Sequence, residues 1–230
     1  MGLSATVTPI TVTCPTGAPN DILIAFLINK ELTVTISAPD GTWTQIYQAN
    51  GDCTTAADDH RAAIFWKLAL TATADDFSFS KSADNNVLFA GVIARWRGQN
   101  QATPVDATAV GATVTVGAAD TVSFPAFDPT STDNETIFAA FYGNDLTTFA
   151  AAMSNDTDPD CTTRFDLETS SGNDCTIAVT SGSNSGANIP ARTWASVSTT
   201  DAGSTGVVFA IVASVGVIPV RLRQFRERWS

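Results

Sequence analysis

The chain has 230 residues, of which 44% are hydrophobic and only 15% are charged, and its formal net charge at pH 7 is −11. Nucleic-acid-binding surfaces need clustered Lys and Arg, so this acidic balance argues against a nucleic-acid partner. The apolar run from Val207 to Val217 is shorter than the roughly 20 residues of a membrane-spanning helix, so we expect no membrane partner.

Polar residues of the chain are mainly Thr, Ser, Asn and Asp, which favour strands and turns over helix surfaces. The first half shows this pattern clearly: alternating residues 32–36 predict a strand, Pro39-Asp40-Gly41 a turn, and residues 43–47 a second strand. Residues 61–70 and 77–80 favour a hairpin. The sequence therefore predicts an all-β fold, an antiparallel, jelly-roll-like β-sandwich.

Two pairs of similar segments indicate an internal repeat. Residues 20–27 and 134–141 each begin with a polar turn and continue as an apolar strand, and residues 86–94 and 205–213 are a second matching pair. A repeat this long does not fit a solenoid or a propeller blade. We expect one sandwich domain, residues 1–216, built from two related halves of about 1–107 and 108–216.

The final segment, residues 217–230, differs from the body. Leu222, Phe225 and Trp229 have the spacing of one helix face, and four arginines surround them: Arg221, Arg223, Arg226 and Arg228. A basic, amphipathic end on an acidic chain indicates a partner, and we expect this tail to dock onto a neighbouring subunit.

Four cysteines, Cys14, Cys53, Cys161 and Cys175, all lie beside turn-forming residues. Buried cysteines usually lie within apolar strands, so these positions predict two disulfides that staple loops. Local pairing, Cys14 with Cys53 and Cys161 with Cys175, is the simplest connectivity, and four free thiols are the alternative.

Residues suited to catalysis are scarce. His60, the one histidine, follows Asp58-Asp59, and we interpret it as a loop residue. The alternating carboxylates of residues 156–160 resemble a calcium loop, but Cys161 stands where that loop needs glycine, which favours a solvated turn. We therefore expect no enzyme activity, no metal site and no cofactor.

Trp43 and Tyr47 are the aromatic residues best placed to bind a ligand. Both lie near a turn, at the edge of a predicted strand, where a flat platform for a host surface glycan could form. Core or rim packing is the more common role of such residues in a sandwich. Both interpretations remain open at this point.

The segments 20–26, 39–43, 94–98 and 103–107 together resemble a recurrent domain of bacteriophage and prophage structural proteins. The resemblance covers most of residues 20–216, and its motifs are turns and strands. It implies a non-enzymatic virion protein, a head decoration, collar or tail-fibre component, assembled in the bacterial host cytoplasm. The partners implied are other virion proteins, with homo-oligomerisation expected. The alternative is a receptor- or glycan-binding module of a phage fibre.

Overall fold

The computed structural model describes residues 4–6, 9–53, 59–83, 87–115, 121–130, 134–143, 153–154, 161–168, 175–184, 188–195 and 203–214. These residues form fifteen strands and no helix, which confirms the predicted all-β, antiparallel sandwich class. The strands are β1 (Ser4–Thr6), β2 (Ile10–Cys14), β3 (Ile22–Asn29), β4 (Ile36–Ser37), β5 (Thr44–Gly51), β6 (His60–Leu68), β7 (Asp75–Lys81), β8 (Phe89–Trp96), β9 (Val105–Thr115), β10 (Thr121–Phe124), β11 (Asn134–Tyr142), β12 (Thr162–Glu168), β13 (Thr176–Asn184), β14 (Arg192–Ala195) and β15 (Ser204–Val212).

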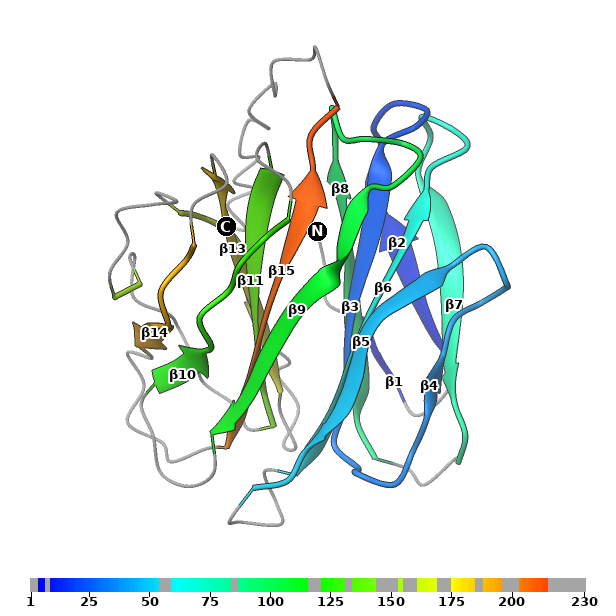
Figure 1. The fold of residues 1–230 in the computed structure, drawn as a ribbon. Coiled ribbons are helices and arrows are strands. Elements are labelled where there is room, and N and C mark those ends of the chain that lie inside the picture. The colour runs from blue at the N-terminus through cyan, green and yellow to red at the C-terminus, as the bar shows by residue number, and fades with distance from the viewer. Residues whose placement is uncertain are drawn as a thin grey trace, which may run out of the picture.

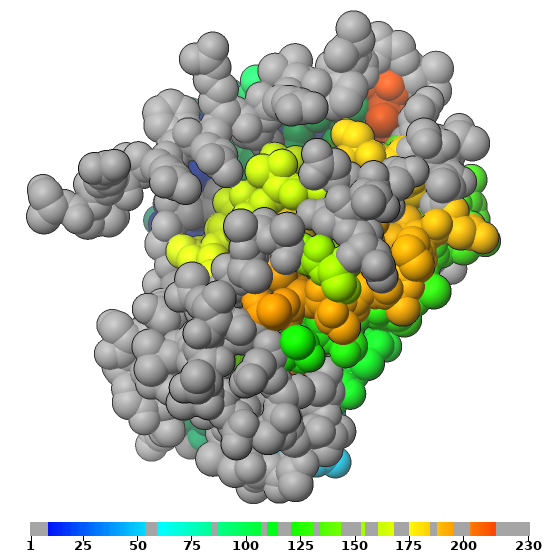
Figure 2. All heavy atoms as spheres, turned by 90° about the vertical axis from the view of Figure 1, so that its left-hand side faces the viewer, coloured from blue at the N-terminus to red at the C-terminus, as the bar shows by residue number. Residues whose placement is uncertain are grey.

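The strands form four layers rather than two (Figure 1). Two five-stranded sheets occupy the middle, with the orders β1-β8-β3-β6-β5 and β12-β13-β11-β15-β9. The sheet β2-β7-β4 covers the outer face of the first, and the pair β10-β14 covers the outer face of the second. Figure 2 looks onto this last layer, where atoms of β14 (orange) and β10 (green) reach the surface.

Apolar residues on both faces of the central strands explain the four layers. Every residue of β3 is buried. Side chains alternate between the two faces of a strand, so Ile24 and Phe26 face the opposite five-stranded sheet, whereas Leu23 and Ala25 face the small outer sheet. A strand of this kind needs cover on both sides, because its apolar side chains gain free energy only when both faces leave water.

The central core joins the two halves of the chain into one body. It contains residues of both five-stranded sheets, and its aromatic centre is Phe26, whose ring meets Phe165 edge-on at 5.6 Å and lies 6.1 Å from the Trp96 ring. Phe26 and Trp96 come from the first half and Phe165 from the second. The halves therefore share a core and are not separate domains.

The strand order of the second sheet repeats that of the first. β3 lies between β8 and β6, as β11 lies between β15 and β13, and the edge strands β5 and β12 occupy matching places. Even an irregularity is repeated. The β5–β6 register slips by one residue at Ile46, and the β12–β13 register slips at Arg164, the third residue of its strand as Ile46 is of β5. The two five-stranded sheets therefore share both their strand order and the position of one bulge.

The repeat seen in the sequence is one residue out of step with the structure at β3 and β11. Matching Asn20 with Asn134 sets Ile24 against Phe138, yet Ile24 lies in the central core and Phe138 in the outer core. A shift of one residue brings inward-facing side chains together, because neighbouring residues of a strand face opposite sides. The expected boundary between the halves, near residue 107, falls inside a strand. β9 begins at Val105, continues past this position and pairs with β15 of the second half.

Gly206 of β15 lies directly beneath the outer layer. A Cβ at this position would stand 2.2 Å from the backbone carbonyl oxygen of Ser123 in β10, so the two layers would have to separate. We expect Gly206→Ala to lower the free energy of unfolding by about 1–3 kcal/mol, the usual cost of overpacking. Gly41→Ala is the matched control, because nothing lies within 4 Å of its added Cβ. Equal denaturation midpoints for both variants would contradict the close approach of β10 to β15.

Candidate functional site

The predicted disulfides are not formed, because all four cysteines are free and buried. Cys14 belongs to the outer core of the first half, Cys161 to the outer core of the second half and Cys175 to the central core. Cys53 packs closely against Gly203, where its side chain fills the space that a Cβ would need. Turn residues beside each cysteine in the sequence suggested exposed loops, but contacts from distant strands bury the thiols.

Cys14 contacts a buried arginine that organises one end of the first half. The Nε of Arg95 donates to Cys14 Sγ at 3.1 Å, and its two terminal nitrogens donate to the backbone carbonyls of Ala18, Thr71 and Thr73. Asp21 Oδ2 lies 3.8 Å from Arg95 Nη1. Burial raises the pKa of the Cys14 thiol, and the nearby guanidinium opposes this effect only in part.

The sequence suggested that His60 is a loop residue, and this prediction is wrong. His60 is the first residue of β6, and it is fully buried. Its Nε2 forms a hydrogen bond of 2.9 Å with the hydroxyl of Thr205 in β15, and its Nδ1 lies 4.0 Å from Cys53 Sγ. Thr205 belongs to the second half of the chain. The histidine therefore ties the two halves together.

Glu135 is the centre of a second tie, which sequence reasoning missed. Arg164, the bulge residue of β12, forms an ion pair of 2.7 Å with Glu135 Oε1, and its Nε donates to Ser181 Oγ. Ser181 Oγ and, at 3.2 Å, Trp96 Nε1 donate to the same carboxylate oxygen. Trp96 comes from the first half, so this network also bridges the halves.

Trp43 and Tyr47 do not form a shared platform. Trp43 is only 7% exposed and packs edge-on against Phe77 and Phe79 of the small outer sheet, with ring centroids 5.1 and 5.2 Å away. The Lys67 ammonium lies 5.4 Å from the Trp43 ring centroid. Tyr47 lies on the other face of the first sheet, partly buried against the central core, and burial raises its pKa. Both rings serve packing.

Two further predictions lie outside the described residues: the docking tail, residues 221–230, and the acidic loop, residues 156–160. Within the described parts of the chain, no group of three His, Cys, Asp or Glu residues is placed to hold a metal ion. No helix in those parts is long and apolar enough to cross a membrane.

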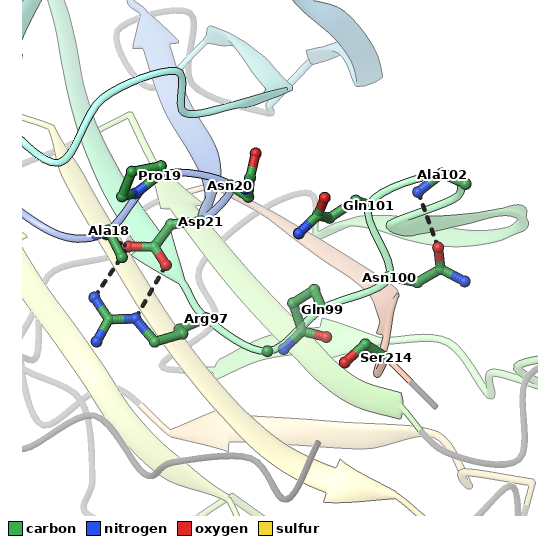
Figure 3. Close-up of a pocket in the computed structure, with 11 residues that line it drawn as sticks. Ala18, Pro19, Asn20, Asp21, Arg97, Gln99, Asn100, Gln101, Ala102 and Ser214 are labelled. Carbon is green, nitrogen blue, oxygen red and sulfur yellow. Dashed lines mark hydrogen bonds and ion pairs between the residues drawn. The ribbon is translucent and has the colours of Figure 1, made fainter. Parts of the chain in front are cut away.

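A polar pocket opens where the two halves of the chain join (Figure 3). It has a cavity volume of about 540 Å³, and its wall comes from residues 18–21 before β3, residues 97–102 between β8 and β9, and Ser214 after β15. Backbone contacts hold the last two segments together: Gln99 bridges Ala213, and the Ser214 N–H donates to the Gly98 carbonyl at 3.0 Å. The pocket therefore depends on contacts between the first and the second half of the chain.

An ion pair forms one side of this pocket. Arg97 donates to both oxygens of Asp21, through Nε at 3.1 Å and Nη2 at 3.4 Å, and this contact raises the pKa of Arg97. The Asp21 carboxylate is buried, whereas the Arg97 side chain is half exposed. Asn20, the residue before Asp21, has a φ of 67°, which points the chain sharply into β3. Asparagine tolerates this left-handed conformation better than most residues.

Thiol titration tests the corrected cysteine assignment. We expect four reactive thiols in protein unfolded without reductant, and slow reaction in the folded protein because all four side chains are buried. The raised pKa of Cys14 leaves little thiolate near neutral pH, so its labelling rate should increase as the pH rises. A Cys14→Ser variant should show three thiols. Fewer than four reactive thiols in the unfolded, unreduced parent protein would contradict this assignment and indicate a disulfide.

Replacement of Trp43 separates packing from ligand binding. We expect Trp43→Ala to reduce the free energy of unfolding by about 3–5 kcal/mol, because it leaves a cavity against Phe77 and Phe79. Trp43→Phe, which keeps an aromatic ring there, should lose less. Chemical denaturation gives both values. An unchanged stability of Trp43→Ala would mean that the ring does not support the outer core.

Comparison of the chain with models of protein families, with curated proteins and with solved structures gave no match. The polar side chains that sequence reasoning marked for chemistry, among the described residues, lie mainly in contacts between strands and between halves. Function must therefore be inferred from this arrangement and from the resemblance of the sequence motifs.

Proposed function

We propose that the chain is a non-enzymatic structural protein of a bacteriophage virion, which decorates or joins other virion subunits as a head decoration, collar or tail-fibre component. The phage assignment rests on the resemblance of segments 20–26, 39–43, 94–98 and 103–107 to a recurrent virion domain. The structural role rests on the way in which the two halves are joined.

The observation that carries the structural role is the set of polar ties across a shared core. His60 meets Thr205, and Trp96 meets Glu135, each linking the first half to the second. These ties lie beside apolar side chains contributed by both central sheets. Buried polar groups that are hydrogen-bonded in this way resist relative movement of the layers, since separation would leave them without partners. A stiff body of this kind suits a protein that must keep its shape in a particle.

The glycan-binding alternative loses its first candidate residues. Trp43 is buried in the outer core, and Tyr47 is partly buried against the central core on the opposite face of the sheet, so the two rings cannot form one open platform for a sugar. This favours a structural role over a fibre-tip module built on these two residues.

The C-terminal tail is the segment that we propose contacts other subunits. Residues 221–230 contain Arg221, Arg223, Arg226 and Arg228 together with Leu222, Phe225 and Trp229, whereas the chain as a whole carries a net charge of −11. Arginines would orient the tail on an acidic neighbour, which includes a second copy of this chain, and the apolar residues would supply affinity. Homo-oligomerisation in the virion follows from this contact.

Quantitative mass spectrometry of purified particles tests the proposal. We expect the chain in the virion fraction at a fixed copy number: hundreds for decoration, about a dozen for a collar and a handful for a fibre. A chain that lacks residues 221–230 should fold with unchanged thermal stability and yet be missing from particles. A chain with Lys in place of the four tail arginines is the control for charge alone. Absence of the full-length chain from purified particles would falsify the virion role.

A further inference from the structure

The pocket at the junction of the halves contains two buried polar atoms without a hydrogen-bond partner. Gln99, only 6% exposed, leaves its Oε1 unpaired, and the Ser214 hydroxyl is unpaired as well. Figure 3 shows both side chains in the pocket wall, where the Gln99–Ala213 bridge brings their backbones together. A buried polar atom without a partner costs about 1–3 kcal/mol, so native proteins usually supply one.

The other side chains in the wall are also neutral hydrogen-bonding groups. Asn20, Asn100 and Gln101 add three carboxamides. Asn100 Oδ1 accepts bonds from the backbone of Ala102 and Thr103, which fixes its side chain. Together with Gln99 and Ser214, these groups present both donors and acceptors within one cavity.

Charge in the pocket is balanced internally. Arg97 is the one cation among the described residues of the wall, and Asp21 already occupies its Nε and Nη2. A phosphate or sulfate would have to approach the buried Asp21 carboxylate and would gain only the N–H groups of Arg97 that Asp21 leaves free, two on Nη1 and one on Nη2. The arrangement therefore favours a neutral ligand that carries several hydroxyl groups.

We propose that this pocket binds a saccharide unit through its hydroxyl groups, and that the Gln99 and Ser214 side chains, whose unpaired oxygens are buried in the wall of the free pocket, turn toward the ligand and bond to two of these hydroxyl groups. Each sugar hydroxyl both donates and accepts, which matches the mixed carboxamide and hydroxyl wall. The volume of about 540 Å³ lies within the range of about 300–1,000 Å³ found for small-molecule pockets and holds a monosaccharide. The site lies away from Trp43 and does not depend on a virion role.

Saturation-transfer NMR with the full-length protein tests this site. The probes are glucose, galactose, N-acetylglucosamine and rhamnose, each at millimolar concentration. We expect transfer to at least one of them, with affinity reduced about fivefold or more in Gln99→Met, which keeps the size of the side chain but removes the acceptor. Ser214→Ala should weaken binding as well. Ser78→Ala, on the outer strand β7, is the control and should bind as the parent protein does.

Three results would overturn the proposal. The first is no transfer to any of the four sugars. The second is equal transfer in the parent protein and in both pocket variants, each with its parent melting temperature. The third is displacement of the sugar by inorganic phosphate at equal concentration, which would make the pocket an anion site. Each result leaves the copy number of the chain in particles unaffected, so this test and the test of the virion role fail independently.

Discussion

The whole structure depends on central strands that are apolar on both faces. β3 and β11 alternate between two cores, so neither sheet can leave one face to solvent, as a two-layer antiparallel sandwich does. Packing the two large sheets against each other satisfies only the inner faces. The outer sheets β2-β7-β4 and β10-β14 cover the outer faces, and this cover buries Cys14 and Trp43 on the first sheet and Cys161 on the second.

The all-β class was predictable from composition, and the matching places of β3 with β11 and of β8 with β15 were predictable from the similar apolar segments, because both signals depend only on local sequence. The register between the halves was not. In a strand such as β3, where every residue is buried, the hydrophobic pattern has no alternation that distinguishes Ile24 from Leu23. Two equally good sequence matches then differ by one residue. Only the pairing with neighbouring strands, and the repeated bulges at Ile46 and Arg164, select between them.

The site was less predictable, because long-range contacts decide it. Cys14 and His60 have turn residues beside them in the sequence, but Arg95 and Thr205, more than 80 residues away, bury them. The pocket combines three segments that are distant in sequence. One local signal was available: the polar run Gln99-Asn100-Gln101 follows a buried strand and is richer in carboxamides than a simple turn requires. That these residues lie in the wall of a pocket, opposite residues 18–21, could be known only from the fold.

The bulges of β5 and β12 also affect the tendency of the protein to aggregate at high concentration. β5 and β12 are each one of the two edge strands of their five-stranded sheet, and an edge strand offers a row of backbone groups to which a foreign strand could pair. A bulge interrupts the regular spacing of those groups and twists the strand, so a flat incoming strand loses register after a few residues. The bulges at Ile46 and Arg164 therefore protect one edge of each large sheet against fibril-like stacking between molecules.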